Sequence, residues 1–170
     1  MQDGSAPTTR IQTRNRARIL EAALDVFSAH GFRGATLDMI ATAAGLSKPN
    51  LLYYFPSKPA IHIALLQNLL SVWLDPLASL DPKGDPLDEL LGYVARKMDM
   101  SRLYPRESRI FANEILAGAP HIHDALAGEL KELVNDRARV ISGWMAQGKL
   151  RPCHPHHLIF SIWSLTQHCA

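Results

Sequence analysis

Residues 36–58 of the chain read TLDMIATAAGLSKPNLLYYFPSK, and they decide the fold of its amino-terminal part. Thr36 is a favourable N-cap for a short helix with apolar residues at helical spacing, and Gly45 can take the positive φ angle that ends such a helix. Ser47 can cap the next helix directly afterwards. Pro49 is tolerated in the first turn because the early backbone N–H groups of a helix have no helical acceptors. The stretch therefore predicts two short helices joined by a tight turn.

Helical periodicity continues on both sides of this stretch. Apolar residues at helical spacing predict a first helix over residues 14–30, which Gly31 ends. Ser57 can cap a long fourth helix, whose apolar stripe runs to a turn cluster at residues 81–86. Further helices are predicted over residues 87–103, 105–117 and 121–147, and from His156 onward. Because no stretch shows the alternation of a β-strand, the predicted fold class is all-α.

The composition limits the class of protein. Of its 170 residues, 47% are hydrophobic and 20% are charged, which suits one or two compact domains and excludes a disordered or fibrous polymer. Two cysteines, Cys153 and Cys169, cannot form a disulfide framework, and no apolar run has the length of a signal or membrane segment. We therefore expect a soluble, cytoplasmic protein. Residues 1–60 hold 7 basic and 4 acidic side chains, so the positive charge lies at the amino end.

These patterns divide the chain into three parts. Residues 1–12 are polar and lack an apolar period, so we expect a disordered arm. Residues 13–58 contain the two short helices and the first helix, which together form a helix-turn-helix domain. Residues 59–170 form a helical bundle. The second short helix of such a domain enters the major groove of double-stranded DNA, and its first turn faces the base edges.

The first turn of that helix carries side chains that suit base recognition. Lys48 can donate to guanine or to phosphate, and Asn50 can read adenine or bond to backbone oxygens. Tyr53 and Tyr54 place hydroxyls one turn further on, and Lys58 adds a cation within reach of flanking phosphates. Each residue alone has a plainer interpretation, because a single lysine is usually a solvated charge and a tyrosine pair is usually half-buried packing.

The block from Thr36 to Lys58, with its central SKPNLLYYFPSK, resembles the TetR family of bacterial transcriptional regulators. The resemblance covers nearly the whole chain, and it implies a three-helix DNA-binding domain followed by a helical domain that binds an effector and dimerises. Pro49 departs from the family pattern, which often has glycine there, and Pro59 stands where glutamate is frequent, so no capping box forms through that residue. The predicted DNA-binding residues are Thr36, Ser47, Lys48, Pro49, Asn50, Tyr53, Tyr54 and Lys58.

In the helical domain, polar and aromatic residues among the apolar ones are candidates for the lining of an effector pocket. Trp163 and Gln167 are four residues apart and so share one helix face. An ordinary place in the core is the alternative for each tryptophan. The predicted ligand-binding residues are Trp73, Phe111, Asn113, Trp163, Thr166, Gln167 and His168.

Four segments, residues 50–58, 116–120, 148–150 and 157–168, resemble the branch of pyrimidine-utilisation (Rut) regulators within this family. That resemblance implies uracil or thymine as the effector. A flat ring with alternating N–H and C=O groups suits stacking on an indole and pairing with an amide such as that of Gln167. The alternatives are a TetR-type regulator of a different small molecule and, as a separate class, a helical adaptor for a protein partner. We expect a homodimer on a near-palindromic operator.

Other classes of site find little support in the sequence. Residues 153–157, Cys-His-Pro-His-His, include metal-ligand residue types, but proline interrupts the run and no second ligand pair follows at finger-like spacing, so neither metal nor cofactor is predicted. No nucleophile motif, carboxylate pair or phosphate-binding loop indicates an enzyme. We expect the chain to be truncated within its last apolar helix at Ala170, because the family usually continues through another helix that completes the dimer interface.

Overall fold

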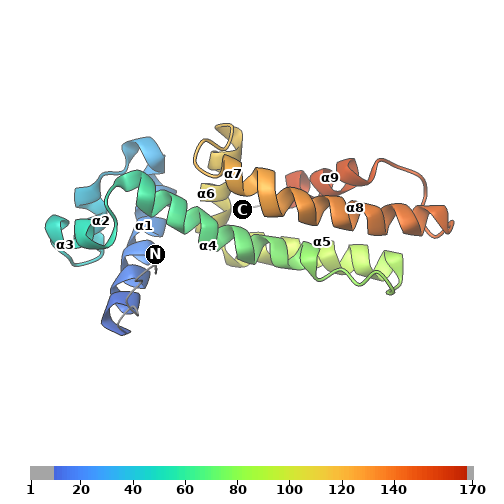
Figure 1. Ribbon diagram of the computed structural model, residues 1–170, viewed down its shortest axis with the longest axis horizontal. Helices are drawn as coiled ribbons and strands as arrows, with labels where there is room; N and C mark the ends of the chain where they lie inside the picture. Colours follow the sequence, from blue (N-terminus) through green and yellow to red (C-terminus); the bar gives the residue numbers. More distant parts are fainter. Residues whose placement is uncertain (1–9, 168–170) are drawn as a thin grey trace, which may run out of the picture. The chain divides into compact units, whose positions relative to one another are not determined.

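The computed structural model describes residues 10–167, and every regular element within them is a helix (Figure 1). This confirms the predicted all-α class. The chain divides into two compact units, with the boundary along the sequence between Leu65 and Leu66. Helix α4 (Lys58–Ala78) contributes its first residues to the amino-terminal unit and its remaining residues to the carboxy-terminal unit.

The amino-terminal unit is built from α1 (Arg10–Gly34), α2 (Leu37–Ala43) and α3 (Lys48–Tyr54). Helix α1 packs against both shorter helices. Full burial of one large apolar side chain contributes about 1.5–3 kcal/mol, so a small set of them is enough to hold three short elements together. The buried side chains of this unit include Ile19, Ala23, Phe27, Ile40 and Leu51.

Helix α1 begins earlier than the sequence pattern predicted. Residues 10–12 belong to the helix, so their assignment to the disordered arm over residues 1–12 is wrong; residues 1–9 lie outside the described residues. The local pattern could not show this, because the contact that favours the extra turn is tertiary: Gln12 Nε2 donates to the Tyr53 hydroxyl at 3.4 Å. At the predicted stop, Gly31 leaves the helical conformation with φ 66° and ψ 172°.

Both predicted N-caps of the helix-turn-helix are confirmed. Thr36 Oγ1 accepts a hydrogen bond from the backbone N–H of Met39 at 3.2 Å, and Ser47 Oγ accepts one from that of Asn50 at 3.3 Å. Each bond satisfies a backbone donor that the helix itself cannot pair, which contributes about 1 kcal/mol. The starts of α2 and α3 are therefore specified by local chemistry.

The turn between α2 and α3 depends on Gly45. Its φ of 59° lies in the left-handed region that glycine adopts without strain. The N–H of the next residue, Leu46, donates to the carbonyl of Ala41 at 2.9 Å, which completes a Schellman motif. A Cβ at position 45 would also collide with the guanidinium of Arg18. Glycine is thus required for the turn, whereas the flexible end of the Arg18 side chain would have to move to admit a Cβ.

The carboxy-terminal unit contains the rest of α4 and a set of further helical segments. These are α5 (Pro86–Leu103), α6 (Pro105–Leu116), α7 (His123–Ala125), the π-helical segment η1 (Leu126–Leu130), α8 (Lys131–Ala146) and α9 (Pro155–Gln167). Helix α9 packs against both α5 and α8 (Figure 1). The core of this unit includes Leu77, Tyr93, Ile141, Trp144 and Ile159.

The single helix predicted over residues 121–147 is wrong. The structure has a short helix, then the π-helical segment, and only then α8. Gly128, with φ −92° and ψ −111°, leaves the helical conformation inside the wide turn. Glycine costs about 1 kcal/mol relative to alanine inside a helix, so Gly128 is a weak position of the pattern, although Gly143 is accommodated within α8. The predictions for α5, α6 and α9 agree with the structure to within one residue at the ends that they specify.

Helix α4 is, within the described residues, the one helix long and apolar enough to cross a membrane by length and composition alone. The core helix of a globular protein passes the same test, and α4 places Leu66, Trp73 and Leu77 in the protein interior. Its first turn is capped by Ser57, whose Oγ accepts from the backbone N–H of Ala60 at 3.2 Å. Pro59 therefore does not prevent the cap.

Candidate DNA-binding surface and effector site

The first turn of α3 faces solvent, as a recognition helix requires. Ser47, Lys48, Pro49 and Asn50 are all exposed, whereas Leu51 is completely buried and anchors the helix to the amino-terminal unit. Because the anchor and the exposed turn are adjacent in sequence, packing of the core determines which side chains α3 presents outward.

Lys48 forms an ion pair within this surface. Its Nζ lies 2.9 Å from Oδ2 of Asp38, and both side chains are largely exposed. Exposed pairs of this kind contribute at most about 1 kcal/mol, so the ammonium can exchange Asp38 for a phosphate or a base at low cost. Asp38 thus positions the Lys48 ammonium at the edge of α3 and still leaves it able to bind DNA.

The two tyrosines at the end of α3 meet the beginning of α1. Tyr53 is 71% exposed, whereas the Tyr54 hydroxyl accepts a hydrogen bond from Asn15 Nδ2 at 2.7 Å. Arg16 donates to the Tyr54 carbonyl at 2.8 Å and places its guanidinium 4.2 Å from the centre of the Phe55 ring. The sequence interpretation missed this contribution of α1, because the local pattern does not show that Asn15 and Arg16 contact the end of α3.

Lys58 has a structural role within the amino-terminal unit. Its Nζ donates to the carbonyls of Phe32 and Ala35, each at 2.7 Å, and lies 4.6 Å from the centre of the Phe32 ring. Two of its three N–H donors are therefore engaged with the connection between α1 and α2. This clasp ties the first residue of α4 to the helix-turn-helix.

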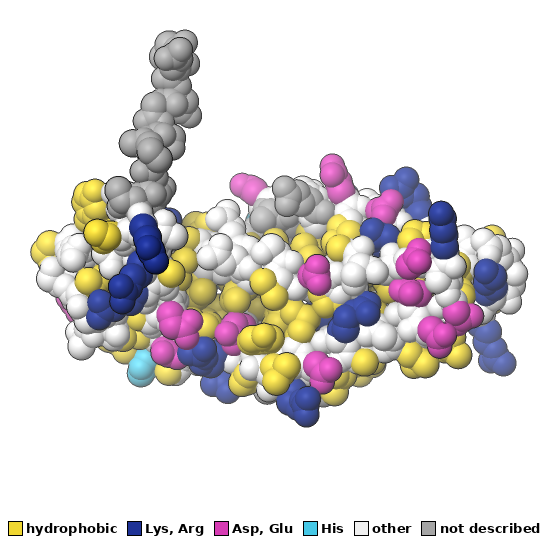
Figure 2. All heavy atoms as spheres, turned by 90° about the horizontal axis from the view of Figure 1, so that it is seen from below, with side chains coloured by type: hydrophobic (Ala, Val, Ile, Leu, Met, Phe, Trp, Pro, Cys, Tyr) yellow, Lys and Arg dark blue, Asp and Glu magenta, His cyan; other side chains and the backbone are white. Residues whose placement is uncertain are grey.

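Charge is distributed unevenly over the surface. Figure 2 shows Lys and Arg side chains following one another across the amino-terminal unit, whereas acidic and basic side chains alternate over the carboxy-terminal unit. The amino-terminal unit carries four exposed arginines on α1, namely Arg10, Arg14, Arg16 and Arg18. A basic surface beside an exposed recognition helix is what attraction to the phosphates of DNA requires.

A second candidate site lies in the interior of the carboxy-terminal unit. Trp73 and Lys97 are 5% and 4% exposed, and the Lys97 Nζ lies 5.0 Å from the centre of the Trp73 ring system. The indole Nε1 of Trp73 is buried and has no hydrogen-bond partner among the described residues. Burial lowers the pKa of Lys97 from its ordinary value of 10.5 to about 8. The sequence interpretation named Trp73 and missed Lys97.

One turn before Lys97 on α5, Tyr93 joins the same interior. Its hydroxyl accepts a hydrogen bond from Trp163 Nε1, and burial raises its pKa to about 12, against smaller opposite effects of that bond and of Arg96. The hydroxyl thus remains protonated at neutral pH. The sequence did contain a signal for Lys97. Positions 93, 97 and 101 lie on one face of α5, and a lysine on a helix face that is otherwise buried is unusual.

The remaining predicted pocket residues lie in different surroundings. Thr166 is buried, but its hydroxyl donates to Ile162 O within α9, and its own carbonyl accepts from Ser101 Oγ at 2.7 Å. Phe111 is half-buried and Asn113 is exposed on α6. The Gln167 side chain and His168 lie outside the described residues. The structure therefore places Trp73 against Lys97 and Trp163 against Tyr93, both on α5, and leaves Asn113 exposed on α6.

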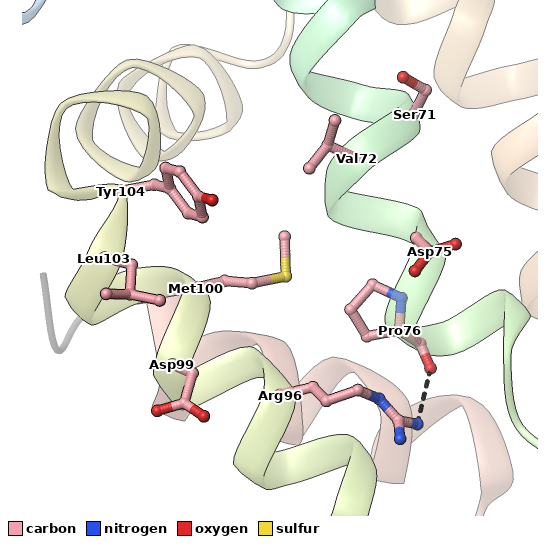
Figure 3. A pocket seen from close by; sticks show the side chains of 9 residues that line it. All are labelled: Ser71, Val72, Asp75, Pro76, Arg96, Asp99, Met100, Leu103 and Tyr104. Carbon is pink, nitrogen blue, oxygen red and sulfur yellow. Dashed lines mark hydrogen bonds between the residues drawn. The ribbon is translucent and has the colours of Figure 1, made fainter.

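A separate open groove of about 520 Å³ lies on the outer faces of α4 and α5 (Figure 3). Met100 reaches from α5 toward Val72 and Pro76 on α4, and an Arg96 N–H lies 3.4 Å from the Pro76 carbonyl. None of the predicted pocket residues lines this groove. Val72 and Arg96, which line the groove, precede Trp73 and Lys97 directly in the sequence. Helices α4 and α5 therefore form the groove with one face and bury Trp73 and Lys97 on another.

Comparison with known proteins assigns the family. The pattern described as bacterial regulatory proteins of the tetR family matches residues 19–65, and the pattern described as the C-terminal region of YcdC-like protein matches residues 66–170. The chain is 47% identical over 174 residues to the HTH-type transcriptional regulator RutR of Escherichia coli (strain K12), which covers 100% of this chain and 82% of that protein. The chain belongs to the TetR family. The HTH-type transcriptional repressor NicS of Pseudomonas putida is 31% identical over 140 residues, or 82% of this chain and 61% of NicS.

Solved structures of TetR-like regulators share the fold. A TetR-like transcriptional regulator from Rhodococcus sp. RHA1 has a TM-score of 0.72 at 21% identity, and GusR of Salmonella enterica has a TM-score of 0.70 at 20% identity. Each covers 91% of this chain, and the chain covers 81% of each. TetR regulators bind operator DNA and small-molecule effectors and typically dimerise. This chain is accordingly a DNA-binding transcriptional regulator of the TetR type.

Proposed function

We propose that this TetR regulator responds to a pyrimidine base, uracil or thymine, and changes its affinity for operator DNA when the base binds. The identity of 47% along the whole chain with RutR carries the proposal, because the chain's own segments resemble the pyrimidine-utilisation branch. The buried Trp73 and Lys97 in the carboxy-terminal unit support it with a polar and aromatic interior. The regulator acts in the cytoplasm, where DNA and the free base are both accessible.

On the DNA side, α3 is the recognition helix. Lys48 and Asn50 contact base edges in the major groove, while Thr36, Ser47 and the Tyr53 hydroxyl bond to phosphates on either side. Exposure of these side chains supports those roles. Pro49 stiffens the first turn, and Tyr54 is held by α1 so that the end of α3 keeps its direction. Lys58 acts chiefly through its clasp and offers its third N–H to a phosphate.

Two copies of the chain bind one operator. The dimer has twofold symmetry, so its two recognition helices read half-sites of a near-palindrome, about 34–36 Å apart for successive major grooves or at a comparable spacing. If each helix-turn-helix neutralises about four phosphates, the logarithm of the binding constant falls with the logarithm of the salt concentration with a slope near −7.

The effector acts through α4. This helix begins with the Lys58 clasp on the helix-turn-helix and carries Trp73 further along, so a change at Trp73 reaches the DNA-binding unit through one continuous element. An effector changes DNA affinity only if it binds two arrangements of the protein unequally, and a coupling of about 1–3 kcal/mol is typical.

Selection of bound DNA from a random pool, with and without uracil, tests the proposal. We expect a near-palindromic sequence to be enriched without uracil and its retention to change when uracil is added. Trp73→Ala should weaken the response to uracil while effector-free binding stays nearly intact, whereas Trp144→Phe, a buried tryptophan of the core, serves as the control. Equal loss of both activities in Trp73→Ala would remove Trp73 from the effector site, and unchanged retention of the enriched DNA with uracil and with thymine would exclude a pyrimidine effector.

A further inference from the structure

One acidic side chain lies on the surface that faces DNA in the proposed function. Within residues 36–58, which hold the helix-turn-helix, Asp38 is the one acidic residue. It belongs to the first turn of α2, and 68% of its side chain is exposed. Its Oδ2 accepts a hydrogen bond from Nζ of Lys48, the first residue of α3, at 2.9 Å. A carboxylate repels phosphates, so attraction to DNA does not explain why an acidic residue lies here.

A purely structural role for this ion pair would be small. The starts of α2 and α3 are already fixed by the caps at Thr36 and Ser47, and the turn between them is closed by a backbone hydrogen bond beside Gly45. An exposed acidic residue in the first turn of a helix adds only a modest stabilisation, as does an exposed ion pair. The effect of Asp38 is therefore expected mainly on its partner, Lys48.

The pair changes one property of Lys48 and leaves another intact. Lys48 is the one charged residue of α3, and 46% of its side chain is exposed. Its ammonium has three N–H donors, of which Asp38 accepts one. Asp38 therefore neutralises the charge of Lys48 locally, while two donors stay available on the exposed side.

The two kinds of contact with DNA depend on these properties differently. Attraction to phosphates depends on charge, and it supplies essentially all of the binding to DNA of arbitrary sequence. A contact with guanine O6 or N7 in the major groove depends on N–H donors that point toward the base edge. A lysine that is paired with a carboxylate thus loses part of its attraction to phosphates and keeps its capacity to donate to a base.

We propose that Asp38 is a specificity-determining residue: its pair with Lys48 lowers the affinity for DNA of arbitrary sequence and directs the ammonium toward a base edge of the operator. This inference rests on the proposed function, in which Lys48 contacts bases, and deepens it. On arbitrary DNA a phosphate must take Lys48 from Asp38, which costs up to about fivefold in affinity for each helix-turn-helix, the upper strength of an exposed ion pair. On the operator the two remaining donors reach a guanine while the pair stays intact.

Fluorescence anisotropy titrations of the full chain test this role. The two probes are the duplex enriched by selection and a duplex of the same length and random sequence, each measured at several salt concentrations. Asp38→Asn should raise affinity for the random duplex by about 3- to 25-fold for two helix-turn-helix domains, and more than it raises affinity for the operator, so the ratio of the two affinities should fall at least about threefold. The salt slope on the random duplex should become steeper by about 0.9 for each domain, because Lys48 then neutralises a phosphate.

A double-mutant cycle shows whether Asp38 acts through Lys48. In a Lys48→Met background, Asp38→Asn should change affinity for the random duplex by less than about twofold, since the partner is absent. Asp25→Asn is the matched control, because it removes an exposed carboxylate from α1 of the same unit, and it should leave the affinity ratio unchanged. Thermal unfolding of each variant shows whether it is folded.

The outcomes separate this inference from the proposed function. An unchanged affinity ratio in folded Asp38→Asn, a fall of the same size in Asp25→Asn, or a full effect of Asp38→Asn without Lys48 would overturn the role of Asp38 alone. Lys48→Met should itself lower the affinity ratio at least about fivefold, and an unchanged ratio would overturn the base contact of Lys48 together with this inference. An unsubstituted protein with equal affinity for both duplexes would overturn the proposed operator recognition.

Discussion

Replacement of Lys97 by methionine is expected to stabilise the protein at neutral pH. Burial lowers the pKa of this lysine from 10.5 to about 8, because the folded interior provides no carboxylate for its ammonium among the described residues. Methionine has a similar length and no charge, so it fills the same space without the desolvation penalty. The substitution should therefore raise stability, because it removes a buried charge that has no compensating partner.

The magnitude follows from the pKa. Each pKa unit corresponds to about 1.4 kcal/mol, so the difference between 10.5 and about 8 amounts to about 3 kcal/mol. The unfolded chain holds the Lys97 proton up to pH 10.5, whereas the folded chain releases it near pH 8. Below pH 8 the full penalty is present. Between pH 8 and 10.5 the unfolded state binds more protons, so the free energy of unfolding gains from this group as the pH rises, and the penalty disappears.

Urea unfolding, followed by circular dichroism at pH 7 and pH 10, measures the effect. Lys97→Met should raise the free energy of unfolding by about 1–3 kcal/mol at pH 7 and by less than about 1 kcal/mol at pH 10. Lys83→Met, which removes an exposed charge, should change it by no more than about 0.5 kcal/mol at either pH. A gain that is the same at both pH values, or a loss at pH 7, would show that Lys97 does not carry an uncompensated buried charge.

Three further predictions concern the helix-turn-helix. Asn50→Ala should reduce discrimination between operator and random DNA by about 1–3 kcal/mol in competitive gel shifts, whereas Lys83→Ala should not; unchanged discrimination would remove Asn50 from base recognition. Ser47→Ala should destabilise the domain by about 1 kcal/mol in thermal unfolding, because the cap of α3 is lost, and an unchanged midpoint would contradict that role. Gly45→Ala should cost more than 1 kcal/mol, on the order of a strained backbone position, because φ is 59° and Arg18 must move; a cost equal to that of Gly34→Ala, where φ is not positive, would argue against strain.

The fold was largely predictable because its decisive signals are local. The caps at Thr36 and Ser47 and the turn at Gly45 involve residues within a few positions of one another, so their chemistry can be read along the chain. The sequence also shows a glycine at position 128, where the helix breaks, but the apolar period on both sides favoured one continuous helix. Periodicity averages over a turn and so hides a single unfavourable residue.

The candidate effector site was only partly predictable, because it depends on which helix faces meet. Aromatic residues stand out in the sequence, and Trp73 and Trp163 were named for that reason. Lys97 looks like an ordinary surface lysine until α5 is placed, since burial on one face of that helix turns it into an uncompensated charge. The same limit explains Asn15, whose bond to the Tyr54 hydroxyl joins residues 39 positions apart.

The clasp at Lys58 depends on the side chain of the donor but not on the side chains of the acceptor residues. Both acceptors are main-chain oxygens, of Phe32 and Ala35, so exchange of either side chain leaves the acceptor atoms in the polypeptide. The donor, in contrast, exists only while position 58 is occupied by a long cation. These two hydrogen bonds therefore tolerate substitution at positions 32 and 35 but are lost when position 58 no longer holds a lysine.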